Sequence, residues 1–269
     1  MTNITADWPQ ILRFAKRYGL PESKKRAIIR EFLQTKIISL VYSQAISKNL
    51  YFVGGTALRL LHGLDRFSED LDFDAPGLSH AGIKNIIKRV YDDLKKENIR
   101  VDFYQNKTAK KTYYELRFPT VLFETGITPN QEEKLAIKLD IEPFWKGQSR
   151  EIVLVNRFGF LGNVVTKTVD QFVVEKLAAY IGRKETAARD VYDLVWLASY
   201  GAKADNEFAK QNGLSIKNML RAAKQKFSRE KRNVLKNRLQ PFLLDEKNTG
   251  KIDFFSFALE NMGKPETLI

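Results

Sequence analysis

Hydrophobic residues recur at both helical and strand spacing in the first part of the chain, and at helical spacing alone in the second part. In the first part, apolar positions at helical spacing predict helices over residues 7–48 and 79–98, and a shorter one from Thr56 to His62. Short apolar segments between and after them predict strands at 49–53, within 66–75, and at 99–105, 111–118, 135–142 and 151–156. After Thr168 the strand signals end. Apolar residues then recur only at helical spacing to about Met262, with breaks near Gly201, Gly213 and Pro241.

Mixed strands followed by a run of helices are typical of an α+β chain rather than a doubly wound sheet. The chain has 269 residues, which is enough for one large domain or two modest ones. The change of pattern near residues 160–168 predicts a core of residues 1–165, with N-terminal helices, and a helical domain of residues 166–269.

The first candidate site is a glycine turn followed by an acidic strand. Gly54, Gly55 and Thr56 lie between a predicted strand and helix, where glycine lets the backbone approach a ligand and a helix N-terminus offers N–H groups to a phosphate. Taken alone, the glycines are better explained by a tight strand-to-helix turn without a ligand. In the segment Asp70-Leu-Asp-Phe-Asp74, alternation places three carboxylates on one face of a strand. Such residues repel one another, and Mg²⁺ is the kind of cation that binds them. The alternative is a solvated acidic edge strand.

A second strand has the same pattern. Residues 135–142, LAIKLDIE, alternate so that Leu135, Ile137, Leu139 and Ile141 face the core and Asp140 faces the other way with Lys138. If the two strands are neighbours, Asp140 joins Asp70 and Asp72 around one metal site. That arrangement suits metal-assisted phosphoryl or nucleotidyl transfer.

The segments 52–58, FVGGTAL, and 66–73, RFSEDLDF, resemble the core of polymerase-beta-type nucleotidyltransferases. More closely, they resemble the AbiEii/AbiGii family of bacterial nucleotidyltransferase toxins, which includes MenT-type toxins. The resemblance implies a mixed sheet flanked by helices, a glycine motif, a D-x-D pair that binds Mg²⁺, and a third carboxylate that matches Asp140. It extends to E-K-x-A-A at residues 175–179 and R-D-x-Y-D at 189–193, and covers roughly residues 30–200.

Two of the helical segments contain the remaining candidates. Lys176 falls inside the apolar arc of residues 169–183, with Arg183 on the same line and Glu175 pointing away. Either the Lys176 ammonium contacts a phosphate or the acidic strand, or its aliphatic chain packs against the apolar residues while the ammonium reaches solvent. In residues 187–200, Asp190 lies at the edge of the core face, whereas Asp193 is expected to point outward. An ion pair of Asp190 with Lys176 or Arg183 is the structural alternative. By resemblance, Lys176 and Asp190 are functional.

The positive charge of the chain indicates a polyanionic binding partner, and its residue composition excludes several classes of site. The formal net charge is +13, and the chain has no cysteine and two histidines, which excludes disulfides, thiol nucleophiles and Cys-based zinc sites. Residues 214–238 hold nine Lys or Arg against one acid, with Ile216, Leu220, Ala223 and Phe227 as the packed stripe. Their exposed face predicts contact with an RNA backbone, although a solvated face is the usual explanation of such a run. The residues expected to bind RNA are Lys217, Arg221 and Lys224.

These observations predict an Mg²⁺-dependent enzyme, with Mn²⁺ as a substitute, that moves an NMP from an NTP to an acceptor hydroxyl. The predicted metal ligands are Asp70, Asp72 and Asp140, and the phosphates are expected to meet Gly54, Gly55, Thr56, Ser68, Lys176 and Arg183. By resemblance, the acceptor is an RNA such as the 3′ end of tRNA, and the protein is a toxin with a cognate antitoxin. The N-terminal residues lack the features of a secretory signal, and no apolar run could span a bilayer, so a cytoplasmic protein is expected.

Three alternatives remain at this stage. The chain could be a nucleotide- or RNA-binding module that has lost catalysis, although its intact carboxylates argue against this. It could transfer a nucleotide to a protein. It could also act on a small cationic substrate, as aminoglycoside nucleotidyltransferases do, but the net charge of +13 would repel such a molecule.

Overall fold

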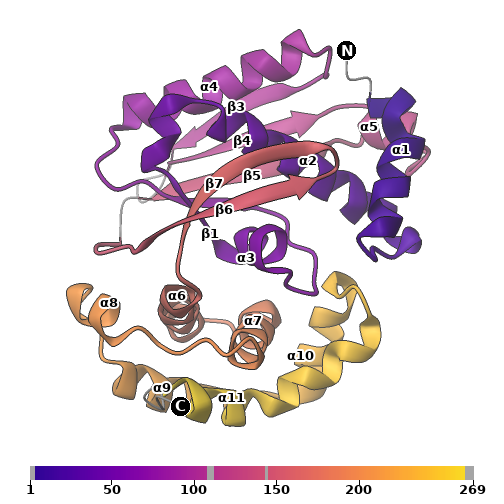
Figure 1. The fold of residues 1–269 in the computed structure, drawn as a ribbon. Coiled ribbons are helices and arrows are strands. Elements are labelled where there is room, and N and C mark those ends of the chain that lie inside the picture. Colours follow the sequence, from indigo (N-terminus) through magenta and orange to yellow (C-terminus); the bar gives the residue numbers. More distant parts are fainter. Residues whose placement is uncertain (1–3, 108–111, 143–144, 264–269) are drawn as a thin grey trace. The chain divides into compact units, whose positions relative to one another are not determined.

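A computed structural model describes residues 4–107, 112–142 and 145–263 (Figure 1). The chain forms two compact units. Unit 1 contains residues 1–63, 67–144 and 152–166. Unit 2 contains residues 167–269 together with two short earlier segments, 64–66 and 145–151. Lys111, where one strand was expected to begin, lies outside the described residues.

A five-stranded mixed sheet forms the centre of unit 1, in the order β1-β2-β5-β4-β3. Only β2 and β5 run parallel, and the other neighbouring strands are antiparallel. This confirms the expected α+β class with a mixed sheet. The strand bounds are β1 Tyr51–Val53, β2 Leu71–Asp74, β3 Asp102–Lys107, β4 Thr112–Phe118 and β5 Leu135–Glu142.

The helices of unit 1 bury apolar faces against this sheet and against one another. In α4, Ser79 caps the N-terminus by accepting a hydrogen bond from the Gly82 N–H at 3.1 Å, and five apolar residues at helical spacing are buried. α2 is buried on several sides and packs against α4 and β5. The helix bounds are α1 Ile4–Arg17, α2 Lys25–Tyr42, α3 Gly54–His62, α4 His80–Lys96 and α5 Val121–Glu124, with 3-10 turns η1 Glu22–Lys24 and η2 Ala45–Asn49.

A separate two-stranded ribbon also belongs largely to unit 1. It pairs β6 (Arg150–Arg157) with β7 (Phe160–Lys167) through a two-residue turn. Phe158 and Gly159 at this turn both have positive φ, 51° and 82°, as the tight turns of twisted hairpins require. The pattern of the sequence predicted β6 but not β7.

Unit 2 is helical, as expected after Thr168. The hairpin of α6 (Val169–Gly182) and α7 (Ala188–Ser199) forms its centre, and α9 and α11 pack against α6 and α7 respectively (Figure 1). The glycine at 213 and the 3-10 turn at Pro241 coincide with predicted breaks. The other elements are α8 Asn206–Gln211, α9 Ile216–Phe227, α10 Arg232–Leu239, η3 Gln240–Phe242, η4 Glu246–Phe254 and α11 Phe255–Met262. No described helix is long and apolar enough to cross a membrane.

Candidate active site

The turn between β1 and α3 brings the backbone directly against an acidic side chain. Gly54 follows β1 with a φ of +77°, in the left-handed region that favours glycine. A Cβ built on Gly54 would lie 2.8 Å from the Asp72 Cγ and 2.9 Å from its Cβ, which is too close for any real side chain. The cause is the pairing of β1 with β2, which sets Val53 opposite Asp72. Glycine is therefore required here both by conformation and by the carboxylate beside it.

Two carboxylates lie at the same level of the sheet. Asp72 in β2 is paired in register with Asp140 in the parallel strand β5. Because neighbouring strands are about 4.8 Å apart and paired residues point to the same face, the two side chains are adjacent. Asp72 is half-buried, and Asp140 is 8% exposed. The condition set from the sequence, that these two strands are neighbours, is met.

Asp70 and Asp74 complete the acidic segment in different ways. Asp70 lies one residue before the start of β2 and is half-buried, whereas Asp74 ends the strand and is only 4% exposed. Within the described residues, no three His, Asp or Glu side chains are grouped closely enough to hold a metal ion. The structure thus aligns two of the three predicted ligands and leaves Asp70 on the adjoining loop.

Lys138 is a further residue of this site that was not among the predicted ones. Its Nζ lies 2.8 Å from the Asp140 Oδ2 and 4.5 Å from the ring centre of Tyr113, the residue opposite Asp140 on β4. The spacing of two residues along β5, which places Lys138 and Asp140 on one face, was the available signal. The ammonium offsets part of the repulsion between Asp140 and Asp72.

The loop that holds Ser68 and Asp70 is fixed by side chains of two helices. Thr56, fully buried on α3, donates its hydroxyl hydrogen bond to the carbonyl oxygen of Asp70. Gln34 on α2 donates to the carbonyl oxygens of Ser68 and Glu69, at 3.2 and 2.9 Å. The Thr56 hydroxyl therefore positions the acidic loop, while Ser68 stays half-buried.

In unit 2, Lys176 belongs to a buried cluster of charges. Its Nζ lies 2.7 Å from the Asp193 Oδ2, and Arg66 binds the same carboxylate with Nε and Nη2, both at 2.6 Å. Asp193 is fully buried, so the expectation that it points outward is wrong. Burial favours its neutral form, but Arg66 and Lys176 outweigh this and lower the pKa of Asp193 to about 2. The carboxylate stays ionised and fixes the position of Lys176.

Asp190 and Arg183 form the second ion pair between these two helices. The Arg183 Nε lies 2.8 Å from the Asp190 Oδ2, with Asp190 buried and the Arg183 side chain 56% exposed. Of the two partners considered from the sequence, the structure selects Arg183 and pairs Lys176 with Asp193. Arg66 was missed as a member of the cluster because it is 127 residues from Asp193 in the sequence.

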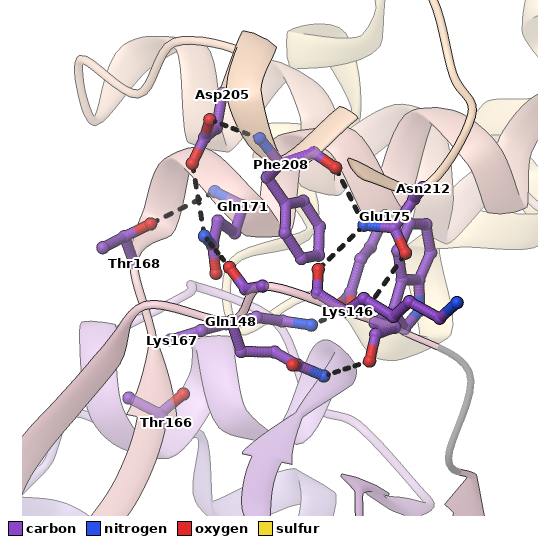
Figure 2. Close-up of polar contacts among 12 residues, drawn as sticks. Lys146, Gln148, Thr166, Lys167, Thr168, Gln171, Glu175, Asp205, Phe208 and Asn212 are labelled. Carbon is purple, nitrogen blue, oxygen red and sulfur yellow. Dashed lines mark hydrogen bonds and ion pairs between the residues drawn. The ribbon is translucent and has the colours of Figure 1, made fainter. Parts of the chain in front are cut away.

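A network of polar contacts holds the start of α6, which carries Lys176 (Figure 2). Gln171 donates from Nε2 to the Gly147 carbonyl and to Asp205, both at 3.2 Å. Lys167 is fully buried and forms an ion pair with Glu175, whose side chain is 13% exposed. Glu175 was expected to point away from the apolar arc that contains Lys176, and the structure pairs it with Lys167 and leaves it largely buried. Phe208, Phe172 and Trp145 surround the Lys167 ammonium at 5.5 to 5.8 Å, a cation–π arrangement.

The predicted RNA-binding residues lie on α9 and are all exposed. Its buried stripe contains Met219 instead of the expected Leu220, which is half-buried. Lys226, counted in the basic run, donates to the carbonyl oxygens of Tyr180 and Arg183 and so caps the end of α6. The exposed predicted residues are Lys217, Arg221 and Lys224.

The predicted catalytic and nucleotide-binding residues fall into two groups. Unit 1 contains the glycine turn with the acidic segments, and unit 2 contains the paired charges of α6 and α7. The unit 1 group is Gly54, Gly55, Thr56, Ser68, Asp70, Asp72 and Asp140, and the unit 2 group is Lys176, Arg183 and Asp190.

Comparisons with known proteins agree with this fold. Two solved structures from Helicobacter pylori, the protein JHP933 and a protein provisionally assigned as a nucleotidyltransferase, each share 22% identity with the chain. Their TM-scores are 0.52 and 0.54; each covers 90% of this chain, and the chain covers 94% and 97% of theirs. No match was found among curated proteins. Residues 40–265 match the family described as nucleotidyl transferase AbiEii toxin of type IV toxin–antitoxin systems. The chain is thus a nucleotidyltransferase that belongs to the AbiEii toxin family.

Proposed function

We propose that this nucleotidyltransferase transfers an NMP from an NTP to a hydroxyl group of an RNA, such as the 3′ end of a tRNA. The acceptor oxygen bonds to the α-phosphorus, the bond from that phosphorus to the bridging oxygen breaks, and pyrophosphate leaves while the hydroxyl loses its proton. The observation that supports this most is the alignment of Asp72 and Asp140 beside the Gly54 turn.

The residues present fit an Mg²⁺ ion, or Mn²⁺ in its place. Mg²⁺ is usually held by one or two carboxylates, with substrate phosphates and waters as its other ligands. Asp72 and Asp140 supply two aligned carboxylates, and Asp70 lies on the adjoining loop. The absence of a three-carboxylate cage among the described residues is compatible with this mode of binding. When bound, the ion neutralises charge on the phosphates that react.

Each remaining residue receives a role from its surroundings. Gly54 and Gly55 are the first residues of α3, and their backbone N–H groups donate to phosphate oxygens, as those of a helix N-terminus do. Ser68 adds a hydroxyl from the loop that Thr56 holds. Asp140 orients the acceptor hydroxyl and takes part in its deprotonation.

The residues of α6 and α7 enter the proposal through the family motifs that contain them. Lys176, held by Asp193, and Arg183, held by Asp190, contribute positive charge for the phosphates. Asp190 acts as a positioning residue for Arg183. The net charge of +13 and the exposed basic face of α9 support a polyanionic acceptor. The type IV toxin–antitoxin family supports the proposal that a cognate antitoxin counteracts the activity.

The test is incubation of the protein with each α-³²P-labelled NTP, Mg²⁺ and total bacterial RNA, followed by a denaturing gel. We expect one nucleotide to label the tRNA band. Asp72→Asn should abolish labelling because it removes a metal-binding charge, while circular dichroism shows an intact fold. The matched control is Asp92→Asn, an exposed carboxylate paired with Lys88 on α4, which should label as the wild type does.

Two results would contradict the proposal. Full activity of Asp72→Asn would remove that carboxylate from the site. Label on protein, with none on RNA, would show that the acceptor is wrong while the transferase activity stands.

A further inference from the structure

Two phenylalanine side chains project from the outer face of α11 and the turn before it. Phe255, Ala258, Leu259 and Met262 form the inner stripe and are at most 2% exposed. Phe254 and Phe257 share the opposite face and are 63% and 62% exposed, more than any other aromatic side chain that the structure describes. Because a buried phenyl ring would stabilise the fold, two adjacent exposed rings are typical of a surface that binds something.

These rings lie beside two basic helices, α9 and α10. Asp253, next to Phe254, pairs with Lys236 of α10 at 2.6 Å. Glu260, one turn beyond Phe257, pairs with Lys224 of α9 at 3.1 Å. In Figure 1, α9, α11 and α10 lie along the same side of the α6–α7 hairpin. The aromatic pair is thus flanked by contacts to both basic helices.

The charge of this surface is strongly one-sided. The exposed face of α9 and α10, with the turn between them, carries seven Lys or Arg residues, and no exposed acid lies within residues 214–238. Exposed pairs such as Lys224–Glu260, whose side chains are 61% and 58% exposed, contribute little stability, so a phosphate can replace the carboxylate at small cost. The exposed basic residues are Lys217, Arg221, Lys224, Arg229, Lys231, Arg232 and Arg238.

We propose that Phe254 and Phe257 stack on unpaired bases of an RNA whose phosphates contact the basic face of α9. Exposed aromatic rings beside a basic surface are the combination by which proteins bind single-stranded nucleic acids, since every base has a face on which a ring can stack. A duplex keeps those faces inside its own stack, so the surface selects single-stranded RNA. This inference rests on the proposed function and adds to it that the acceptor has at least two unpaired nucleotides.

The test measures binding by fluorescence anisotropy, with a short single-stranded RNA and a blunt duplex of equal length, at several salt concentrations. The variant Phe254→Ala/Phe257→Ala should lose about tenfold or more in affinity for the single strand, with an unchanged salt slope. Phe254→Trp/Phe257→Trp should retain binding because indole also stacks. The matched control is Phe123→Ala, which removes a ring that is 42% exposed on α5 in unit 1 and should have no effect.

A charge variant separates stacking from phosphate contact. Replacing Lys217, Arg221 and Lys224 by Gln should weaken the binding of both RNAs. The slope of log affinity against log salt concentration should become shallower by about 2 for the single strand, since each phosphate contact contributes about 0.7. The two variants are therefore distinguishable: the Phe→Ala variant changes the affinity but not the salt slope, and the Gln variant changes both.

Several outcomes overturn the inference. Unchanged single-strand affinity of Phe254→Ala/Phe257→Ala would do so, as would an equal loss on the duplex or a wild type that binds no RNA. If that variant kept RNA binding but lost binding to vesicles of phosphatidylserine and phosphatidylcholine, the surface would be a lipid-binding one.

The labelling assay keeps this inference distinct from the proposed function. A wild type that labels RNA, together with an alanine variant that binds RNA normally, refutes only the stacking. A wild type that binds single strands through these rings but never labels RNA refutes only the proposed transfer.

Discussion

Replacing Asp193 by Asn should destabilise the helical unit strongly, because the carboxylate balances two buried cations. Arg66 contacts it with two nitrogens at 2.6 Å and Lys176 with one at 2.7 Å, and Asp193 is fully buried. Removing one partner of a buried ion pair typically costs about 3–5 kcal/mol, since the remaining charges stay buried without compensation. The lowering of the Asp193 pKa from 3.8 to about 2 corresponds to about 2 kcal/mol of stabilisation at neutral pH.

The pH dependence follows from the direction of this shift. Because the pKa of Asp193 is lower in the folded state, its contribution is complete above about pH 4 and is lost as the pH falls towards 2. The difference in unfolding free energy between wild type and Asp193→Asn should therefore narrow by about 2 kcal/mol over that interval. Urea unfolding followed by tryptophan fluorescence measures it, since Trp145 and Trp196 belong to unit 2.

The matched control is Asp253→Asn, which removes a partly exposed partner of Lys236 and should cost no more than about 1 kcal/mol. A loss below about 1 kcal/mol for Asp193→Asn at pH 7 would refute the reasoning, as would a difference from wild type that is constant between pH 5 and 2.

Two further predictions concern unit 1. Gly54→Ala should reduce transfer by about 100-fold or more, because the added Cβ displaces the Asp72 carboxylate and a misplaced catalytic group has an effect of that order. The control is Gly77→Ala, since Gly77 has a nearly equal φ of +76° but open space around it. Equal loss of transfer in both variants would mean that backbone strain alone is responsible. Glu31→Gln should lower the free energy of unfolding, measured by urea denaturation, by about 3 kcal/mol or more, since Glu31 is 2% exposed and pairs with both Arg59 and Arg157. A change below about 1 kcal/mol would contradict this.

The sequence predicts elements well where local patterning and packing agree. The strand at 135–142 has its expected bounds because LAIKLDIE alternates without interruption and every core-facing residue is buried. The long helix before β3 begins one residue later than expected because Ser79 is its cap. β7 was missed since FLGNVVTK shows no alternation of apolar and polar residues: its burial alternates only over the first four residues, and the last four are all buried.

The charged residues were harder to place because their partners are remote in sequence. A helical projection puts Asp193 outside the apolar face of α7, but it does not contain Arg66, which arrives from a separate segment to bury the carboxylate. Glu175 was hard to place for a different reason: its partner Lys167 is only eight residues earlier, but it lies before α6 among aromatic rings and so outside the helical projection. By contrast, the pairing of Asp72 with Asp140 was accessible, since alternation fixes the faces and only the adjacency of two strands had to be assumed.

The carboxylates of the two units therefore differ in what they can bind. Asp193 has its two oxygens occupied by Arg66 and Lys176 in a fully buried position, so a metal ion could reach it only by displacing both cations. That geometry suits a residue that keeps a lysine charged and correctly placed. Asp72 is half-buried and aligned with Asp140, whose partner Lys138 has a side chain that is 33% exposed and can turn towards solvent. A divalent cation would replace the ammonium there at low cost, because the lysine would regain hydration that a buried arginine would not.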